Sequence, residues 1–124
     1  MGIGSMALSS EMSRLQRERS RLIRLLTFPS ELAVGSVARV QRKCGNPLCG
    51  CREAQGHPQT IFLYKDDQRR RHCKLVRRAD EDRMQKAGAR YRKWRKAFNR
   101  LCAIENRQKQ ILVAEIKKKA ICYE

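Results

Sequence analysis

The first apolar pattern along the chain has the spacing of a helix. Its members follow steps of four and three residues, with Arg19 interrupting one step: Leu8, Met12, Leu15, Leu22 and Leu26. This is the seam of a helix that packs against a partner helix. Ser9 is the candidate N-cap, and Pro29 ends the helix because the residue before a proline is pushed out of helical geometry.

From Gly35 onward the pattern is typical of strands. Ser36 to Arg42 predicts a first short strand, and the β-branched and aromatic run Ile61 to Tyr64 predicts a second. Lys65 to Gln68 predicts a hairpin turn that leads into a third strand, Arg71 to Val76. So few short strands are not stable alone in water, so the sequence predicts that something staples them.

The last part of the chain predicts one long helix. It opens at Ala79 to Asp82, with Asp80 as the candidate N-cap, and runs from about Asp80 to Lys118. Its apolar seam and the face that continues it are Met84, Ala87, Tyr91, Trp94, Phe98, Leu101, Ile104, Ile111, Leu112 and Ile116. The plain arrangement is an antiparallel pairing with the first helix, with the strands between the two.

The charge of the chain restricts its partners. Its 124 residues carry 29 Lys and Arg against 12 Asp and Glu, a formal net charge of +17. Such an excess repels itself unless a polyanion or counterions offset it, which indicates DNA, RNA or an anionic membrane surface. We expect no membrane anchor, because no apolar stretch approaches the ~20 residues of a bilayer span.

Met1 to Ser10 lack the basic start and the apolar run of a signal peptide, so we expect no export signal. Met1 to Ser5 has the character of a leader before Met6 and is left out of the fold prediction. Without an export signal, the six cysteines are expected to be thiols or metal ligands in a reducing compartment. We therefore expect a cytoplasmic protein, with association with the nucleoid as one form of that expectation.

A cysteine cluster carries the most specific chemistry. Cys44, Cys49, Cys51 and His57 give the spacing C-x4-C-x-C-x5-H. Zinc in structural sites takes four such ligands, and three thiolates with one imidazole form a known set. The sequence therefore predicts a Zn²⁺ ion held by these four side chains. Three alternatives stay open: a disulfide, unrelated free thiols, or Cys73 in place of His57 as the fourth ligand.

The cluster and its surroundings resemble a known family. The run Arg42 to Cys51, a preceding Gly35-Ser36 and a following Gly56-His57 resemble a short prokaryotic domain family with a Cys3His cluster. That family has no assigned function and is often encoded near mobile elements. The likeness covers roughly Gly35 to Leu101. Val37 stands where that family usually has Leu. The resemblance implies that the four cluster side chains form one site, and it implies no activity.

The basic residues form the candidate nucleic-acid interface. Between Arg39 and Arg100, nineteen Lys or Arg stand against six acids, and few glutamates lie nearby to pair with them. Neutralising phosphates with such cations releases counterions, which drives binding. The candidate contacts are Arg42, Lys43, Arg52, Lys65, Arg69, Arg70, Arg71, Lys74, Arg77, Arg78, Arg90, Arg92, Lys93, Arg95, Lys96 and Arg100.

A few residues bear on which kind of nucleic acid is bound. The arginines of the predicted hairpin, Arg69 to Arg71, could enter a groove. Tyr64 is a candidate for stacking on bases, whereas Tyr91 and Trp94 belong to the seam and are expected to pack in the core. DNA is favoured slightly over RNA, only because the resemblance points toward mobile elements.

The sequence leaves two alternatives to DNA binding and disfavours catalysis. An enzyme is not expected, because the acids of Asp66-Asp67 and Asp80 to Asp82 are explained by a turn and a helix start. The alternatives are an RNA-binding protein and an interaction adaptor. Such an adaptor would be a coiled-coil subunit of a larger nucleic-acid complex, for example one with a mobile-element enzyme. The helical arms would then mediate homo-oligomerisation or partner binding.

The predicted fold class is therefore α+β. It is an antiparallel, coiled-coil-like helical hairpin with a small zinc-stapled three-stranded antiparallel β module between the helices. The segments are residues 1–34 for the first helix, 35–78 for the zinc-binding β module and 79–124 for the long basic helix, in one domain overall.

Overall fold

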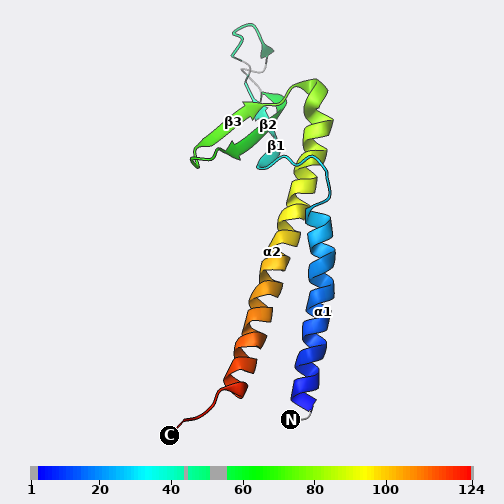
Figure 1. The fold of residues 1–124 in the computed structure, drawn as a ribbon. Helices are drawn as coiled ribbons and strands as arrows, with labels where there is room; N and C mark the ends of the chain where they lie inside the picture. The colour runs from blue at the N-terminus through cyan, green and yellow to red at the C-terminus, as the bar shows by residue number, and fades with distance from the viewer. Residues whose placement is uncertain (1–2, 44, 51–55, 124) are drawn as a thin grey trace. The chain divides into compact units, whose positions relative to one another are not determined.

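The computed structural model describes residues 3–43, 45–50 and 56–123 (Figure 1). Its elements in chain order are α1 (Ile3–Leu26), β1 (Ser36–Arg42), β2 (His57–Lys65), β3 (Arg71–Leu75), the 3-10 turn η2 (Arg78–Asp80) and α2 (Glu81–Lys119). The strands form one antiparallel sheet in the order β1-β2-β3. The predicted class, α+β with two helices and a three-stranded antiparallel sheet, is confirmed.

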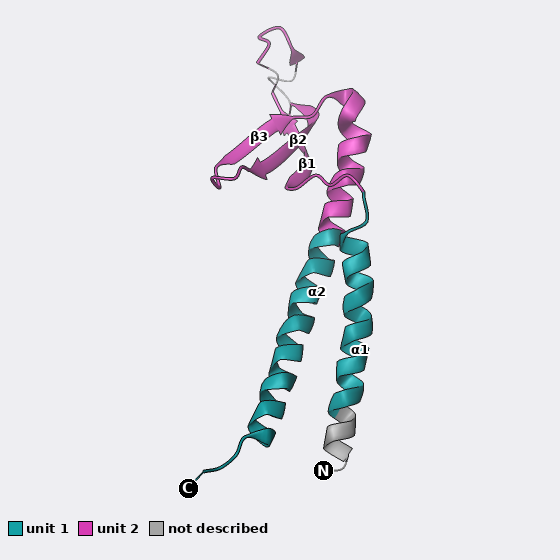
Figure 2. Cartoon of the chain, in the orientation of Figure 1, with its two compact units in different colours: residues 1–29, 94–124 teal, residues 30–93 magenta. Residues whose placement is uncertain are grey.

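The chain divides into two compact units (Figure 2). One contains residues 1–29 and 94–124 and is called the helical unit below. The other contains residues 30–93 and is called the sheet unit. Helix α2 contributes its first part to the sheet unit and the remainder to the helical unit. Neither α1 nor α2, within the described ranges, combines the length and the apolar composition needed to cross a bilayer.

The helical unit is held by a small apolar core and by ion pairs. The core cluster consists of buried Leu15, Ile104 and Ile111, with Leu8, Met12 and Leu22 packed against them. The ion pairs join Glu11 to Arg107, Glu18 to Arg100 and Arg19 to Glu105. From Glu11 to Glu18 the partner moves back from Arg107 to Arg100, so the two helical segments run antiparallel within this unit.

Part of the predicted apolar face of α2 does not face the core. Ile104 and Ile111 are buried, but Leu112 and Ile116 are 55% and 67% exposed. Successive helical residues are rotated by about 100°, so positions one and five residues beyond Ile111 point away from its side. Phe98 is 44% exposed as well, and its ring stacks on Trp94 with 5.2 Å between the centroids.

The strand boundaries agree with the sequence at β1 and extend it at β2. β1 is the predicted Ser36–Arg42, and β3 ends at Leu75, one residue before the predicted end. β2 begins at His57, four residues before the predicted Ile61, because residues 57–60 pair with residues 39–42 of β1. Helix α1 likewise begins at Ile3, so Ser9 is not its N-cap.

One face of the sheet packs against the first turns of α2. A Cβ placed on Gly88 would lie 3.1 Å from Val37 Cγ2, so a glycine there lets helix and strand approach closely. Val37 pairs with Phe62 in the register, so both side chains lie on this face. The backbone N–H of Ala33 donates to the carbonyl of Ala87 at 3.1 Å, which ties the segment before β1 to the same helix. On the opposite face, Leu63 is 42% exposed.

Candidate nucleic-acid interface and metal ligands

The turn between β2 and β3 is closed by backbone hydrogen bonds. The N–H of Arg69 donates to the carbonyl of Asp66 at 2.9 Å, and the N–H of Asp66 donates to the carbonyl of Arg70 at 3.0 Å. Arg69 has a φ of 63°. Among the described residues, every other residue with positive φ is a glycine. The turn therefore contains one left-handed residue, and that residue is an arginine.

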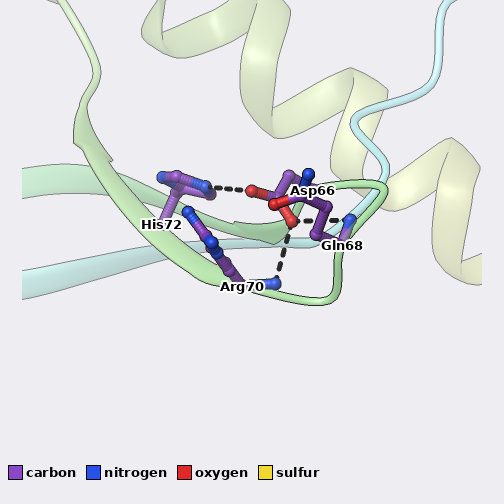
Figure 3. A network of polar contacts seen from close by, with 4 residues as sticks. All are labelled: Asp66, Gln68, Arg70 and His72. Atoms are coloured by element: carbon purple, nitrogen blue, oxygen red, sulfur yellow. Dashed lines mark hydrogen bonds and ion pairs between the residues drawn. The ribbon is translucent and has the colours of Figure 1, made fainter.

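The carboxylate of Asp66 organises this turn (Figure 3). Its Oδ1 accepts the backbone N–H of Gln68 at 2.9 Å and that of Arg70 at 2.8 Å, and its Oδ2 lies 2.9 Å from Nε2 of His72. The hydrogen bond with His72 is the largest of the effects that lower the pKa of Asp66, followed by the bonds from the backbone. Both carboxylate oxygens of Asp66 are thus hydrogen-bonded, to backbone N–H groups of the turn and to His72.

The cations around this turn are exposed and have no carboxylate partner among the described residues. They are Lys65, Arg69, Arg70, Arg71 and Lys74. In the described part of the chain, no ion pair joins any of these side chains to an acid. Lys65 also lies directly opposite Arg71 in the β2–β3 register. We call these five residues the hairpin cations.

Tyr64 is packed within the sheet unit. Its ring stacks on Phe62 and on His72, with 5.1 Å between the centroids in each case. His72 lies opposite Tyr64 in the register, so the three rings form one row on the face that also holds Val37. The stacking that the sequence suggested with bases is therefore made with protein rings in this structure.

Some of the predicted contacts on α2 are hydrogen-bonded to other segments of the chain, and others are exposed to solvent. Arg90 donates to the backbone carbonyl of Glu31 at 2.9 Å, and Arg100 binds the carboxylate of Glu18 at 2.6 and 2.9 Å. For Arg100 the shortage of glutamates nearby in the sequence is thus met by an acid from another segment, which local counting does not reveal. The exposed members are Arg77, Arg78, Arg92, Lys93, Arg95 and Lys96, of which the first two precede α2. At the end of β1, Arg42 and Lys43 are exposed, and Arg52 lies outside the described residues.

The carboxylates in these ion pairs respond to their partners. The side-chain hydrogen bond from Arg100 is the largest of the effects that lower the pKa of Glu18. Arg83, which the sequence did not single out, binds the carboxylate of Glu31 and lowers its pKa in the same way. These arginines serve the packing of their own units.

The predicted metal ligands fall partly outside the described residues. Cys44 and Cys51 are not described, whereas Cys49 and His57 are, with 3.0 Å between Cys49 Sγ and His57 Nε2. Two ligands of one tetrahedral zinc ion lie roughly 3.5 Å apart at the usual bond lengths. The pair is therefore close enough for both atoms to bind one ion, with a small outward movement.

Local structure explains why Cys49 and His57 meet. The carbonyl of Asn46 accepts the N–H of Cys49 at 3.1 Å, and its Oδ1 accepts the N–H of Leu48 at 3.0 Å, which forms a tight turn. His57 lies opposite Arg42 at the end of β1, so the β1–β2 pairing returns the chain to the start of the cluster. Gly56, just before His57, has a φ of 99° and lies against the backbone of Arg42.

The register also separates Cys73 from this pair. Cys73 lies opposite Leu63, six residues beyond His57 in β2, which is roughly 20 Å at the rise of a strand. Cys49 and Cys73 are both free thiols. Within the described ranges no group of three or more candidate ligands comes together, so the zinc site stays a prediction that depends on Cys44 and Cys51.

No family model matches the chain, and neither a curated protein nor a solved structure is significantly similar to it. The resemblance to the Cys3His-cluster family stays a prediction.

Proposed function

We propose that this chain is a nucleic-acid-binding protein, with DNA favoured slightly over RNA, and that its binding surface is centred on the hairpin cations. The observation that carries the proposal is the use of the acids. The oxygens of Asp66 bind backbone N–H groups and His72, and among the described residues no ion pair joins Asp66 to the arginines beside it, so the guanidinium groups stay open to phosphates. In this proposal the chain binds and does not catalyse.

The physical basis is the release of counterions. The phosphates of a nucleic acid hold condensed counterions, and exposed Lys and Arg side chains release these counterions when they neutralise the phosphates. The exposed cations Arg77, Arg78, Arg92 and Lys93 belong to the same sheet unit and add to its positive charge. The affinity is expected to fall steeply as salt rises.

The proposed scaffold is an antiparallel, coiled-coil-like helical hairpin that carries a zinc-stapled β module. Cys44, Cys49, Cys51 and His57 would hold the Zn²⁺ ion. The 3.0 Å between Cys49 Sγ and His57 Nε2 supports this assignment, as does the position of Cys44 two residues after Arg42, the partner of His57 in the sheet. Thiolate ligands require a reducing compartment, so we propose a cytoplasmic location.

Fluorescence anisotropy tests the proposal with a labelled DNA duplex, a single strand and an RNA duplex over a range of salt. Replacing Arg69, Arg70 and Arg71 together by Ala is expected to weaken binding and to flatten its salt dependence. The matched control replaces Arg17, Arg21 and Arg24 of α1 by Ala, which removes the same charge from exposed positions of the helical unit. Equal losses in the two triple variants would show that net charge, and not the hairpin, drives binding.

A second candidate function has its own observation. Several large apolar side chains near the C-terminus are exposed: Ile116 at 67%, Ile121 at 89% and Tyr123 at 96%. Such side chains favour an adaptor that self-associates or joins a larger nucleic-acid complex. Light scattering across a concentration series tests this, and a monomer at every concentration that also binds nucleic acid would favour the first function.

A further inference from the structure

The β2–β3 hairpin contains two features that are unfavourable for stability. The first is the left-handed backbone of Arg69, with φ of 63°. This conformation crowds the Cβ of any L-residue, and hairpin loops of this kind usually place glycine at the left-handed position. Three hydrogen bonds to the Asp66 side chain and two between backbone groups hold the turn in this shape.

The second feature is the like-charge pair at the base of the hairpin. Lys65 and Arg71 lie directly opposite each other in the register. Like charges at directly opposed positions of an antiparallel pair destabilise it. An acid at either position would stabilise the hairpin. Two independent costs in one short segment indicate selection for something other than stability.

We propose that this hairpin is a probe for the major groove of B-form duplex DNA and that Arg69 is its principal contact. This inference rests on the proposed function and narrows its ligand from nucleic acid to duplex DNA. Insertion into the major groove requires a rigid, narrow and positively charged ribbon of the protein chain. The β2–β3 ribbon has exposed cations on both strands and in its turn, and its turn is pre-organised by Asp66.

The dimensions of the major groove determine which duplex such a ribbon can enter. The major groove of B-form DNA is about 12 Å wide and admits a two-stranded ribbon. The major groove of A-form RNA is deep and narrow, and side chains cannot read it. A hairpin that functions by insertion therefore distinguishes duplex DNA from duplex RNA of the same sequence. A purely electrostatic surface would bind the two with similar affinity.

The test compares the unmodified protein with Arg69→Gly on DNA and RNA duplexes of one sequence, at one salt concentration. The unmodified protein is expected to bind the DNA duplex about tenfold more tightly, and Arg69→Gly to lose about tenfold on DNA, which is the effect of one groove contact. Because glycine relaxes the left-handed backbone, the midpoint of thermal unfolding of Arg69→Gly is expected to stay at or above that of the unmodified protein. Arg17→Ala, an exposed single-charge control on α1, is expected to retain the preference for DNA.

Each contrary result has a distinct meaning. Equal affinity of the unmodified protein for the two duplexes, or DNA binding by Arg69→Gly equal to that of Arg17→Ala, would overturn the groove probe while leaving nucleic-acid binding intact. A lower thermal midpoint for Arg69→Gly would show that the fold needs Arg69, which also removes the inference. Absence of binding to every nucleic acid by the unmodified protein would remove the proposed function itself.

Discussion

Two residues with positive φ, Gly56 and Arg69, occupy contrasting environments. A Cβ on Gly56 would come within 2.6 Å of the backbone C and O of Arg42, so that position requires glycine for steric reasons as well as for its φ of 99°. Arg69 is exposed and would be relaxed by glycine. One position therefore serves the fold, and the other we assign to binding.

Replacing Gly56 by Ala tests the first assignment. The added methyl group must push the start of β2 away from Arg42, and we expect the free energy of unfolding to fall by at least about 2 kcal/mol. Urea unfolding measures this loss. Gly50→Ala is the matched control, because none of the described residues comes within 4 Å of a Cβ at that position beyond its chain neighbours, and we expect it to remain close to the unmodified protein. Comparable losses in both variants would contradict the close approach at Gly56.

At this scale the sequence predicted the turn but not its most informative residue. Asp66 was assigned to a turn, and its carboxylate does accept backbone N–H groups there. Its bond with His72 depends on the cross-strand register, which single residues do not reveal. The left-handed Arg69 was not predicted, because arginine is not a residue that signals this conformation.

At the scale of elements, local preference predicted the strands where their side chains are apolar or β-branched. β1 was predicted with its observed bounds, and the start of β2 was missed. Residues His57 to Thr60 include a proline and polar side chains, and they form a strand because β1 lies beside them. The stretch that was missed carries His57, so the pairing that extends β2 also positions the candidate ligand.

The charge pattern of the β2–β3 element leads to a prediction for Lys65→Glu. An acid opposite Arg71 converts a like-charge pair into an attractive one, and we expect the free energy of unfolding to rise by about 0.5 kcal/mol. The affinity for duplex DNA should fall in the same variant, because the hairpin loses a cation and gains an acid. Thermal unfolding and anisotropy measure the two effects.

Lys74→Glu provides the matched control for that change. It makes the same change in charge on the neighbouring strand, but Lys74 lies opposite Phe62 and not opposite a cation. We expect Lys74→Glu to lower affinity without the gain in stability. A hairpin in which Lys65→Glu lowers stability would show that the opposed cations are not a cost, and would weaken the functional assignment of this segment.

At the scale of the whole molecule, several acids bind groups within their own unit. In the helical unit Glu11, Glu18 and Glu105 each bind an arginine of the other helical segment. In the sheet unit Glu31 binds Arg83, and Asp66 binds the turn. With 29 cations and 12 acids in the chain, this use of the acids leaves the excess positive charge to solvent or to a polyanion. The net charge was evident from the sequence, but which arginines are engaged depends on the tertiary contacts.

The zinc assignment concerns the stability of the whole sheet unit, and removal of metal tests it. If Cys44, Cys49, Cys51 and His57 hold one Zn²⁺ ion, the purified protein should contain about one zinc per chain, since structural zinc sites bind tightly at neutral pH. A chelator should then lower the midpoint of thermal unfolding, because the loss of the ion releases the start of β2 from the cluster.

Cys49→Ser should lack the zinc and be insensitive to the chelator. Cys102→Ser, which alters an exposed free thiol on α2, should keep both the zinc and the response. A metal-free purified protein with the same thermal midpoint as Cys49→Ser would mean that Cys49 and His57 are neighbours in the fold without being ligands, and that the packing of the sheet on α2 stabilises this unit without a metal.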